Sequence, residues 1–505
     1  MDRPQLDSSV EAHRLVARFL RSHGYTATLD SFLADATSNH PRLPSLLDRT
    51  GAAGQDAGHD LQDVVDDWVS SRLARLKVDD PLETLRDQLD QCELVEQEVP
   101  KGEVQTGVRD ATNILTVTRG TLPRREWDTQ ESRYRSYDTS CIFTTAVDRT
   151  LKIWSSSSFE LLETHTLPSP SLSTTQHPSP ELARFVVCST MEGSLVVLDL
   201  VTREVKTQLK DHTKYIVRTA WSPDGRYIAT IGYDKHIHIY RFDLSDCSSS
   251  SSEAPTALDD EEPDPLATCP DVTLTKAHTV TARTNPEAAV WLPDSQWLVW
   301  SAREDHLLHY LRAPADSAAA GADDAAVWEE QTINMNENGD SFVSFSVLFI
   351  TLHPTLPLLS LQTNTPSARI LLYPFHSSTR LLTLHTTASQ SDYFAPRHAW
   401  LPSGSAVAVN SEDGALRLVD LRGRVRLLAG AHGAAAPPDE DEVALDAQLR
   451  SERARLRREK DKGSSVIRDV EVLGGDEDAQ GRRTPWRIVS CGFDKTVKVL
   501  GGGAV

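Results

Sequence analysis

The chain has 505 residues, of which 39% are hydrophobic, and it carries a formal net charge of −21 with an isoelectric point near 5.2. That apolar content suffices for folded cores, and the length suggests about three domains, or one large β domain with appendages. An acidic surface repels phosphate backbones and anionic lipids, so we expect neither nucleic-acid binding nor membrane binding.

The cysteines and the apolar stretches bear on the compartment. Six cysteines are few for this length and form no C-x-x-C pair, which argues against a disulfide scaffold and a zinc ribbon. The first residues have no apolar core of the signal-peptide kind, and the most apolar stretch, 342–361, is interrupted by two prolines. We therefore expect a protein of the cytosol or the nucleus without a membrane span.

The N-terminal segment predicts two short helices around a glycine. Each helix carries an apolar stripe at helical spacing: Leu15, Val16, Phe19 and Leu20, then Leu29, Phe32 and Leu33. Gly24 stands where the first helix would end, and Thr26 can cap the second. Two helices of this size cannot bury both stripes alone, so some apolar surface should pack against a partner or a second copy.

Residues 8–40 resemble the LisH motif, through the spacing G-Y-x-x-T-x-x-x-F that begins at Gly24. Asp35 stands where the family usually has glutamate. The resemblance implies a homodimer formed through this region, for which we select Leu15, Phe19, Leu29 and Phe32. The alternative is an ordinary helical hairpin that docks on its own domain.

A further helical segment is expected over residues 56–98. One amphipathic pattern runs from Leu61 to Leu76, acidic at its start and basic at its end, as suits the helix dipole. Pro81 marks a second helix start, followed by leucines at helical spacing. Two heptads are too short for a coiled coil, so we expect helices packed on their neighbours.

A degenerate repeat fills the rest of the chain. Three segments align without gaps: AVDRTLKIW (146–154), GYDKHIHIY (232–240) and GFDKTVKVL (492–500). Each has Asp, a basic residue and then alternating apolar residues, which is the period of a β-strand. Weaker copies bring the number to seven, with turn residues at positions 148, 192, 234, 305, 367, 413 and 494.

The spacing of the copies predicts propeller blades with insertions. Three of the spacings are close to the blade period of about 40–45 residues. The longer spacings each contain a segment without strand character, and we predict insertions there, at 245–270, 313–330 and 434–462. The first of these is serine-rich and acidic, and the third changes from acidic to basic along its length.

Most copies are preceded by a W-x-P or H-P turn between apolar runs, as in AWSPDGRYIAT at 220–230. This pattern resembles the WD repeat. The resemblance implies a mainly β fold: a seven-bladed WD-repeat β-propeller over 104–500, preceded by the α-helical region that contains the LisH-like motif. The chain stops after the third strand of the last blade, so its outer strand should come from 104–108 or from 113–118.

The third copy matches the hydrogen-bonded tetrad of WD repeats at His212, Thr230, Asp234 and Tyr240. A His, Thr and Asp set could instead be a catalytic triad. However, the same aspartate recurs at Asp148 and Asp494, and an active site is not repeated in every blade, so we predict a structural role. A partial second copy of the tetrad is expected from His278, Ser301 and Asp305.

No catalytic residues, metal or cofactor are expected. The sequence lacks G-x-S-x-G, H-E-x-x-H and G-x-x-x-x-G-K motifs, and it has no clustered metal-ligand spacing. A propeller enzyme is the less favoured alternative, because no polar cluster converging from several blades is recognisable in the sequence.

Protein partners are expected on the face around the channel mouth. The resemblance places there the residue before each turn aspartate and the start of each first strand, from which we select Tyr215, Val217, Tyr233, Glu304, Glu412 and Phe493. Aromatic rings on a rim could anchor a peptide, or each ring could pack against the neighbouring blade.

The expected function is a non-enzymatic scaffold or adaptor. The order of LisH-like motif, helices and propeller resembles ubiquitin-ligase adaptors that recruit substrates, corepressors and dynein regulators. The sequence does not choose among them.

Overall fold

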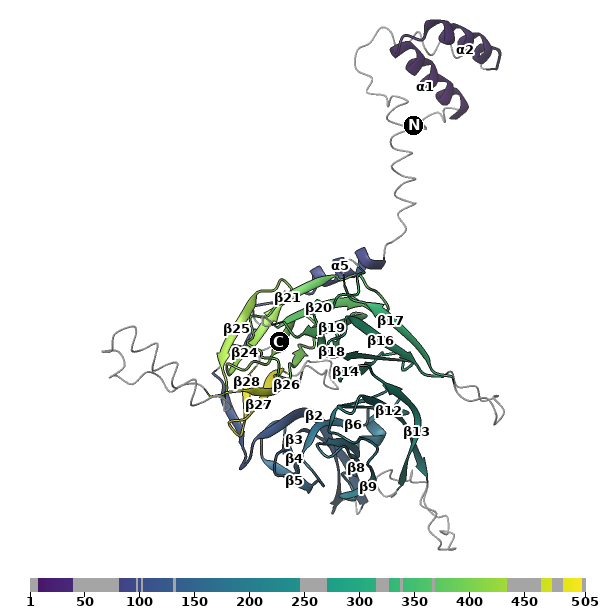
Figure 1. Ribbon diagram of the computed structural model, residues 1–505. Helices are drawn as coiled ribbons and strands as arrows, with labels where there is room; N and C mark the ends of the chain where they lie inside the picture. The colour runs from purple at the N-terminus through teal and green to yellow at the C-terminus, as the bar shows by residue number, and fades with distance from the viewer. Residues whose placement is uncertain are drawn as a thin grey trace, which may run out of the picture. The chain divides into compact units, whose positions relative to one another are not determined.

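The computed structural model describes residues 8–39, 81–96, 99–100, 103–129, 133–245, 270–314, 327–336, 339–365, 368–433, 465–474 and 485–501. The chain divides into two compact units, residues 1–84 and residues 85–505. The first unit contains a helical hairpin, and the second contains all the strands (Figure 1). Most of the expected helical segment 56–98, namely 56–80, lies outside the described residues, as do most of the three expected insertions.

The hairpin consists of α1 (Ser8–Ser22) and α2 (Thr26–Asn39), as the apolar stripes predict. Gly24 connects the helices with a φ of +75°, a conformation that costs glycine little. The amide of Tyr25 then bonds to the carbonyl of Leu20 at 2.9 Å and closes the end of α1. Ala17, Leu29 and Ala36 form the buried contact between the helices.

The second unit is a seven-bladed β-propeller, which confirms the predicted fold class. Among the described residues, 28 strands form seven four-stranded antiparallel sheets around a common axis (Figure 1). Blades 1 to 3 contain β2 (Ile114–Asp128), β3 (Arg133–Ala146), β4 (Thr150–Ser155) and β5 (Leu161–Thr166); β6 (Ser171–Gln176), β7 (Phe185–Thr190), β8 (Leu195–Asp199) and β9 (Glu204–Leu209); and β10 (Ile216–Trp221), β11 (Tyr227–Gly232), β12 (His236–Ser245) and β13 (Asp271–Thr281).

Blades 4 to 6 contain β14 (Pro286–Trp291), β15 (Trp297–Ala302), β16 (Leu307–Arg312) and β17 (Glu329–Asn334); β18 (Val347–Leu352), β19 (Leu358–Thr363), β20 (Arg369–Pro374) and β21 (Leu382–His385); and β22 (His398–Trp400), β23 (Ala406–Val409), β24 (Ala415–Asp420) and β25 (Val425–Gly430). Strand β17 already includes Glu329 and Glu330, so the insertion expected over 313–330 ends before the outer strand of blade 4 begins.

Blade 7 is closed by a strand from the other end of the propeller sequence. It contains β26 (Ile467–Leu473), β27 (Arg487–Gly492) and β28 (Thr496–Gly501), and β1 (Gln105–Arg109) pairs with β28 as its outer strand. Of the two candidates for this strand, the structure therefore uses the segment near 104–108. The segment 113–118 instead begins β2, the inner strand of blade 1. The pairing leaves no open sheet edge on β28.

The recurrent Asp and basic residue form the turn between the second and third strand of a blade. The carboxylates of Asp148, Asp234 and Asp494 each accept the backbone N–H two residues later, at 3.1 to 3.2 Å. The basic residue between them has a positive φ of 63–68°, which the aspartate bond helps to hold. The repeat is thus a turn signal that locates one edge of each blade.

The core lies between neighbouring sheets. Every residue of the second strands β7 and β11 is buried, because both faces of these strands are covered by adjacent blades. Between blades 3 and 4, Tyr227 and Ile239 pack with Trp291 and Leu298. Beyond the blades, the short helix α5 (Pro81–Gln91) packs Leu89 against buried residues of blades 5 and 6.

Candidate functional site

Three of the four tetrad residues form one buried network in blade 3. The imidazole of His212 contacts Asp234 Oδ1 through Nδ1 at 3.0 Å and Thr230 Oγ1 through Nε2 at 2.9 Å. The amide of Thr213 donates to Asp234 Oδ2 at 2.9 Å. The hydroxyl of Tyr240 donates to Asp211 at 2.9 Å, an acceptor that the sequence reasoning missed. Burial lowers the pKa of His212 and disfavours its charged form.

Blade 7 repeats this network with residues that the sequence analysis did not join. His432 contacts Asp494 Oδ1 through Nδ1 at 2.8 Å and Ser490 Oγ through Nε2 at 3.0 Å. The hydroxyl of Thr496 donates to the same aspartate at 2.8 Å. Two copies of one arrangement favour a structural role over a catalytic one. The sequence feature that could have revealed this second network is the His432-Gly pair. The insertion at 434–462 separates this pair from the rest of blade 7 in the sequence.

The expectation for a partial tetrad in blade 4 is wrong. Asp305 Oδ2 contacts His309 Nε2 at 3.1 Å and not His278. His278 lies in β13, the outer strand of blade 3, where its ring stacks on Trp328 at 5.1 Å. Within the described residues, the hydroxyl of Ser301 is buried without a hydrogen-bond partner. His278 is taken up by strand pairing, so it cannot lie in the loop that would bring it to the turn of blade 4.

Two of the selected rim aromatics pack together at the channel mouth. The rings of Tyr215 and Tyr233 are 4.6 Å apart, and both side chains are partly buried. The hydroxyl of Tyr233 donates to Glu287 Oε1 of blade 4 at 2.7 Å, and the Nε of Arg303 donates to the same oxygen at 2.6 Å. Burial and the Glu287 carboxylate raise the pKa of Tyr233. These rings join blades 3 and 4 and are only partly open to a partner.

The other selected residues lie apart from this pair. Glu304 is exposed, and its amide donates to Ser346 Oγ at 2.8 Å. Glu412 accepts the hydroxyl of Ser391 at 2.6 Å. The remaining two are partly buried: Val217, which packs against the core between blades 3 and 4, and Phe493, whose amide donates to the carbonyl of Val466.

The most exposed aromatic side chains were missed by the sequence analysis. Tyr393 is 99% exposed and Phe342 is 74% exposed, in the loops that lead into blades 6 and 5. The Nη1 of Arg303 donates to the carbonyl of Asp392 at 2.9 Å, which ties the Tyr393 loop to blade 4 at the mouth. Asn336 holds the Phe342 loop through its Nδ2, which donates to the carbonyl of residue 342 at 2.6 Å. An aromatic residue inside a polar loop is the sequence feature that could have identified these exposed side chains.

The inner strands form a ring of side chains in the channel. In six of them the pairing with the second strand skips one residue near the start of the strand, which is a β-bulge. Six residues follow these bulges directly, and Arg397, just before β22, is the equivalent residue of blade 6. We call these seven residues the channel ring: Thr116, Ser173, Arg218, Ala288, Phe349, Arg397 and Asp469.

The channel ring and the next layer contain unlike charges. The guanidinium carbons of Arg218 and Arg397 lie 4.4 and 4.8 Å from the centroid of the Phe349 ring. Burial raises the pKa of Asp469, and it raises the pKa of Glu471 in the next layer to about 7. Polar groups from several blades therefore do converge here, contrary to the expectation from the sequence, which had no knowledge of the register.

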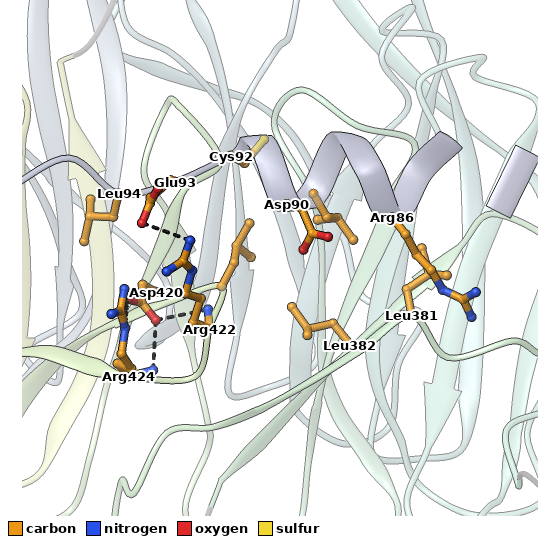
Figure 2. Close-up of a pocket in the computed structure, with 12 residues that line it drawn as sticks. Arg86, Asp90, Cys92, Glu93, Leu94, Leu381, Leu382, Asp420, Arg422 and Arg424 are labelled. Carbon is orange, nitrogen blue, oxygen red and sulfur yellow. Dashed lines mark hydrogen bonds and ion pairs between the residues drawn. The ribbon is translucent and has the colours of Figure 1, made fainter. Parts of the chain in front are cut away.

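A side groove of about 550 Å³ lies between α5, the start of the outer strand β21 of blade 5 and the turn that follows β24 in blade 6 (Figure 2). Leu381 and Leu382 form an apolar wall, and Arg86 and Asp90 extend from the helix (Figure 2). At the far end, Arg422 pairs with Glu93, two residues after the helix ends, at 3.1 Å. These contacts attach the segment that follows α5 to blade 6.

Neither metal ligands nor a membrane helix stand out in the described part of the chain. No group of three or more His, Cys, Asp or Glu side chains is placed there to hold a metal ion. Among the helices described, none is long and apolar enough to cross a membrane.

Comparison with known proteins supports one repeat directly. Residues 203–241, which run from β9 through most of β12 and include the tetrad, match the family described as WD domain, G-beta repeat.

The chain is also similar, over short stretches, to curated proteins. It is 32% identical over 105 residues to echinoderm microtubule-associated protein-like 3 of Mus musculus. The aligned stretch covers 21% of this chain and 11% of that protein. It is 28% identical over 113 residues to echinoderm microtubule-associated protein-like 2 of Homo sapiens, with 21% and 17% covered. It is 34% identical over 56 residues to the chromatin assembly factor 1 subunit FAS2 homolog of Oryza sativa subsp. japonica, with 11% of each covered. The chain thus spans less than a fifth of each of these relatives.

Proposed function

We propose that this WD-repeat propeller is a non-enzymatic scaffold that binds partner proteins on the face around its channel mouth. The carrying observation is the pair of exposed aromatic side chains, Phe342 and Tyr393, on hydrogen-bonded loops that precede the first strands of blades 5 and 6. Exposed rings on held loops suit partner anchoring, since they give large contact area at a small cost in conformational entropy. The carboxylates of Glu304 and Glu412 supply a polar rim near them.

The buried Ser–His pair between blades 5 and 6 supports the non-enzymatic part of the proposal. Ser360 Oγ lies 2.7 Å from His398 Nε2, and Gln362 Oε1 lies 2.9 Å from His398 Nδ1. This resembles a nucleophile, base and orienting group. Ser360 is fully buried, however, so a substrate cannot reach it. Burial and the nearby cations lower the pKa of His398 to about 3, far below that of a general base working near neutral pH.

The partner-binding face is tested by affinity purification of the full chain with identification of the bound proteins. We expect Phe342→Ala with Tyr393→Ala to lose partners that the native chain retains. The matched control is Leu428→Ala, which removes a 63% exposed apolar side chain on β25, the outer strand of blade 6. Equal retention of all partners by both variants would contradict the proposed face. The identities of the partners would also decide among a substrate-recruiting ubiquitin-ligase subunit, a corepressor and a dynein regulator.

We propose further that the N-terminal hairpin forms a homodimer. Leu15, Phe19 and Phe32 are only partly buried within the hairpin, whereas Leu29 is 8% exposed and already serves its internal core. Burying each of the three in a dimer would contribute up to about 1.5–3 kcal/mol. Light scattering should show a dimer for the full chain and a monomer after removal of residues 1–40. A full chain that is monomeric at micromolar concentration would contradict the dimer.

A further inference from the structure

Two arginines of the channel ring lie against the same aromatic ring. Arg218 comes from blade 3 and Arg397 from the residue before the first strand of blade 6, and the Phe349 ring that both contact comes from blade 5. Their guanidinium carbons are 4.4 and 4.8 Å from the same ring centroid, so they are no further apart than the sum of these distances. Two like charges at this range repel each other unless an anion lies near both.

The described residues provide little compensation for these charges. No carboxylate there lies within 4.0 Å of either guanidinium, and the one hydrogen bond is from Arg397 Nη1 to its neighbour, the carbonyl of Pro396, at 2.8 Å. Each guanidinium has five N–H donors, so most of these donors have no hydrogen-bond partner among the described residues. Burial, opposed in part by Asp469, lowers the pKa of Arg218 to about 10, which still leaves it charged at neutral pH.

Asp469 compensates the pair only in part, because it is a single carboxylate that forms no ion pair with either guanidinium, and each of its oxygens already accepts a backbone amide. Its Oδ2 accepts the amide of Val117 at 3.2 Å, and its Oδ1 accepts the amide of Val470 at 3.0 Å. Burial and the Arg218 cation lower the pKa of Arg397 well below its ordinary value, although a guanidinium stays protonated near neutral pH. The ring therefore contains two arginines and one carboxylate that already has two donors. Glu471 in the next layer is partly protonated near neutral pH, since burial raises its pKa to about 7.

Arg218 and Phe349, whose ring Arg397 also contacts, border a cavity of suitable size. The channel holds a space of about 280 Å³ lined by Arg218, Phe349, Asp469 and Glu471, with the threonines of neighbouring inner strands. At about 30 Å³ per water this equals roughly nine water molecules, enough for a phosphate group and a small carrier. Guanidinium groups match phosphate oxygens with paired N–H bonds.

We propose that the channel binds the phosphate group of a small soluble molecule between Arg218 and Arg397. The phosphate oxygens accept from both guanidinium groups, and Phe349 holds the two groups in place from the side. Asp469 limits the negative charge that the site accepts. A protonated Glu471 can donate a further hydrogen bond to an oxygen of the ligand.

The test is calorimetric titration of the full chain with inorganic phosphate and with pyrophosphate, with sodium chloride at the same ionic strength as the blank. We expect saturable binding of at least one of the two, weakened about tenfold or more by Arg218→Gln and by Arg397→Gln. Arg241→Gln is the matched control, because Arg241 is exposed on β12 and pairs with Asp243 at 3.0 Å. It should bind as the native chain does.

Asp469→Asn separates the proposal from loss of folding. The amide oxygen of asparagine can still accept the Val117 amide, and removal of the negative charge should strengthen phosphate binding. A misfolded variant could not bind more tightly. The proposal is overturned if phosphate and pyrophosphate give no more heat than chloride, if both arginine variants bind normally, or if Asp469→Asn weakens binding in a folded chain. It is also overturned if only an acidic peptide, and neither phosphate probe, binds in an arginine-dependent way.

Discussion

The buried His398 should make the propeller lose stability as the pH falls. Burial, together with the cations of Arg218 and Arg397, lowers the pKa of His398 in the folded chain to about 3, against an ordinary value of 6.5. Its Nε2 lies 2.8 Å from Thr351 Oγ1 and 2.7 Å from Ser360 Oγ, and its Nδ1 lies 2.9 Å from Gln362 Oε1, which suits a neutral ring that donates from Nδ1 and accepts at Nε2. The unfolded chain thus binds a proton below pH 6.5 that the folded chain does not bind.

The sign and size of the effect follow from this difference. Stability rises with pH wherever the unfolded state binds more protons, so the contribution of His398 is complete above pH 6.5 and falls as the pH drops toward 3. At about 1.4 kcal/mol per pH unit, the loss between pH 6.5 and pH 5 is about 2 kcal/mol. Other buried histidines add to the same trend, so the contribution of His398 must be isolated by substitution.

The assay is urea unfolding at pH 7 and at pH 5, followed by tryptophan fluorescence. His398→Gln should be less stable than the native chain at pH 7, because it cannot reproduce all three hydrogen bonds. Its further loss on going to pH 5 should be smaller than that of the native chain by about 2 kcal/mol. The exposed His385 provides the control, and His385→Gln should keep the native pH dependence. An identical pH dependence in native chain and His398→Gln would refute the reasoning.

Two further predictions concern packing. Asp234→Ala should leave His212 and a turn amide unpaired, which costs about 1–3 kcal/mol for each group. The melting temperature should therefore fall, while partner binding per folded molecule should stay unchanged. An unaltered melting temperature would instead point to a functional role of the aspartate. Gly120→Ala places a Cβ 1.9 Å from the buried ring of Phe143, and overpacking of this kind costs about 1–3 kcal/mol or more. Gly501→Ala, where a Cβ meets nothing within 4 Å, should leave the urea midpoint unchanged, and equal midpoints for both variants would contradict the packing argument.

The blades could be predicted because their signal is local. A turn aspartate, a basic residue at positive φ and an alternating strand occupy about nine consecutive residues, so each copy is legible without its neighbours. The closing strand was predictable for a related reason: a missing fourth strand leaves an open edge that the fold must cover. The tetrad of blade 3 was legible because His212 lies close in sequence to Asp234.

Features that depend on distant parts of the chain were not recovered. The second tetrad joins His432 to Asp494 across the insertion at 434–462. Strands β2 and β3 are 15 and 14 residues long, more than twice the usual strand in the other blades, and their repeat gave no sign of this extension. The false tetrad at His278 arose because spacing alone does not show which residues an outer strand takes up.

The channel ring shows the physical limit of reading strands by alternation. A period of two places Arg218 on the same face as Ile216, which is fully buried in the core. The bulge between these residues changes the phase, so Ile216 packs into the blade while Arg218 reaches the channel. Alternation also fails to identify Phe349 as a channel residue, because it lies in a run of apolar residues that all appear to belong to the core. The same phase change occurs near the start of six inner strands. The residues that line the channel are therefore determined by the backbone at the starts of all seven inner strands together. A charge placed after a bulge is therefore where propellers of this kind should be searched for channel ligands.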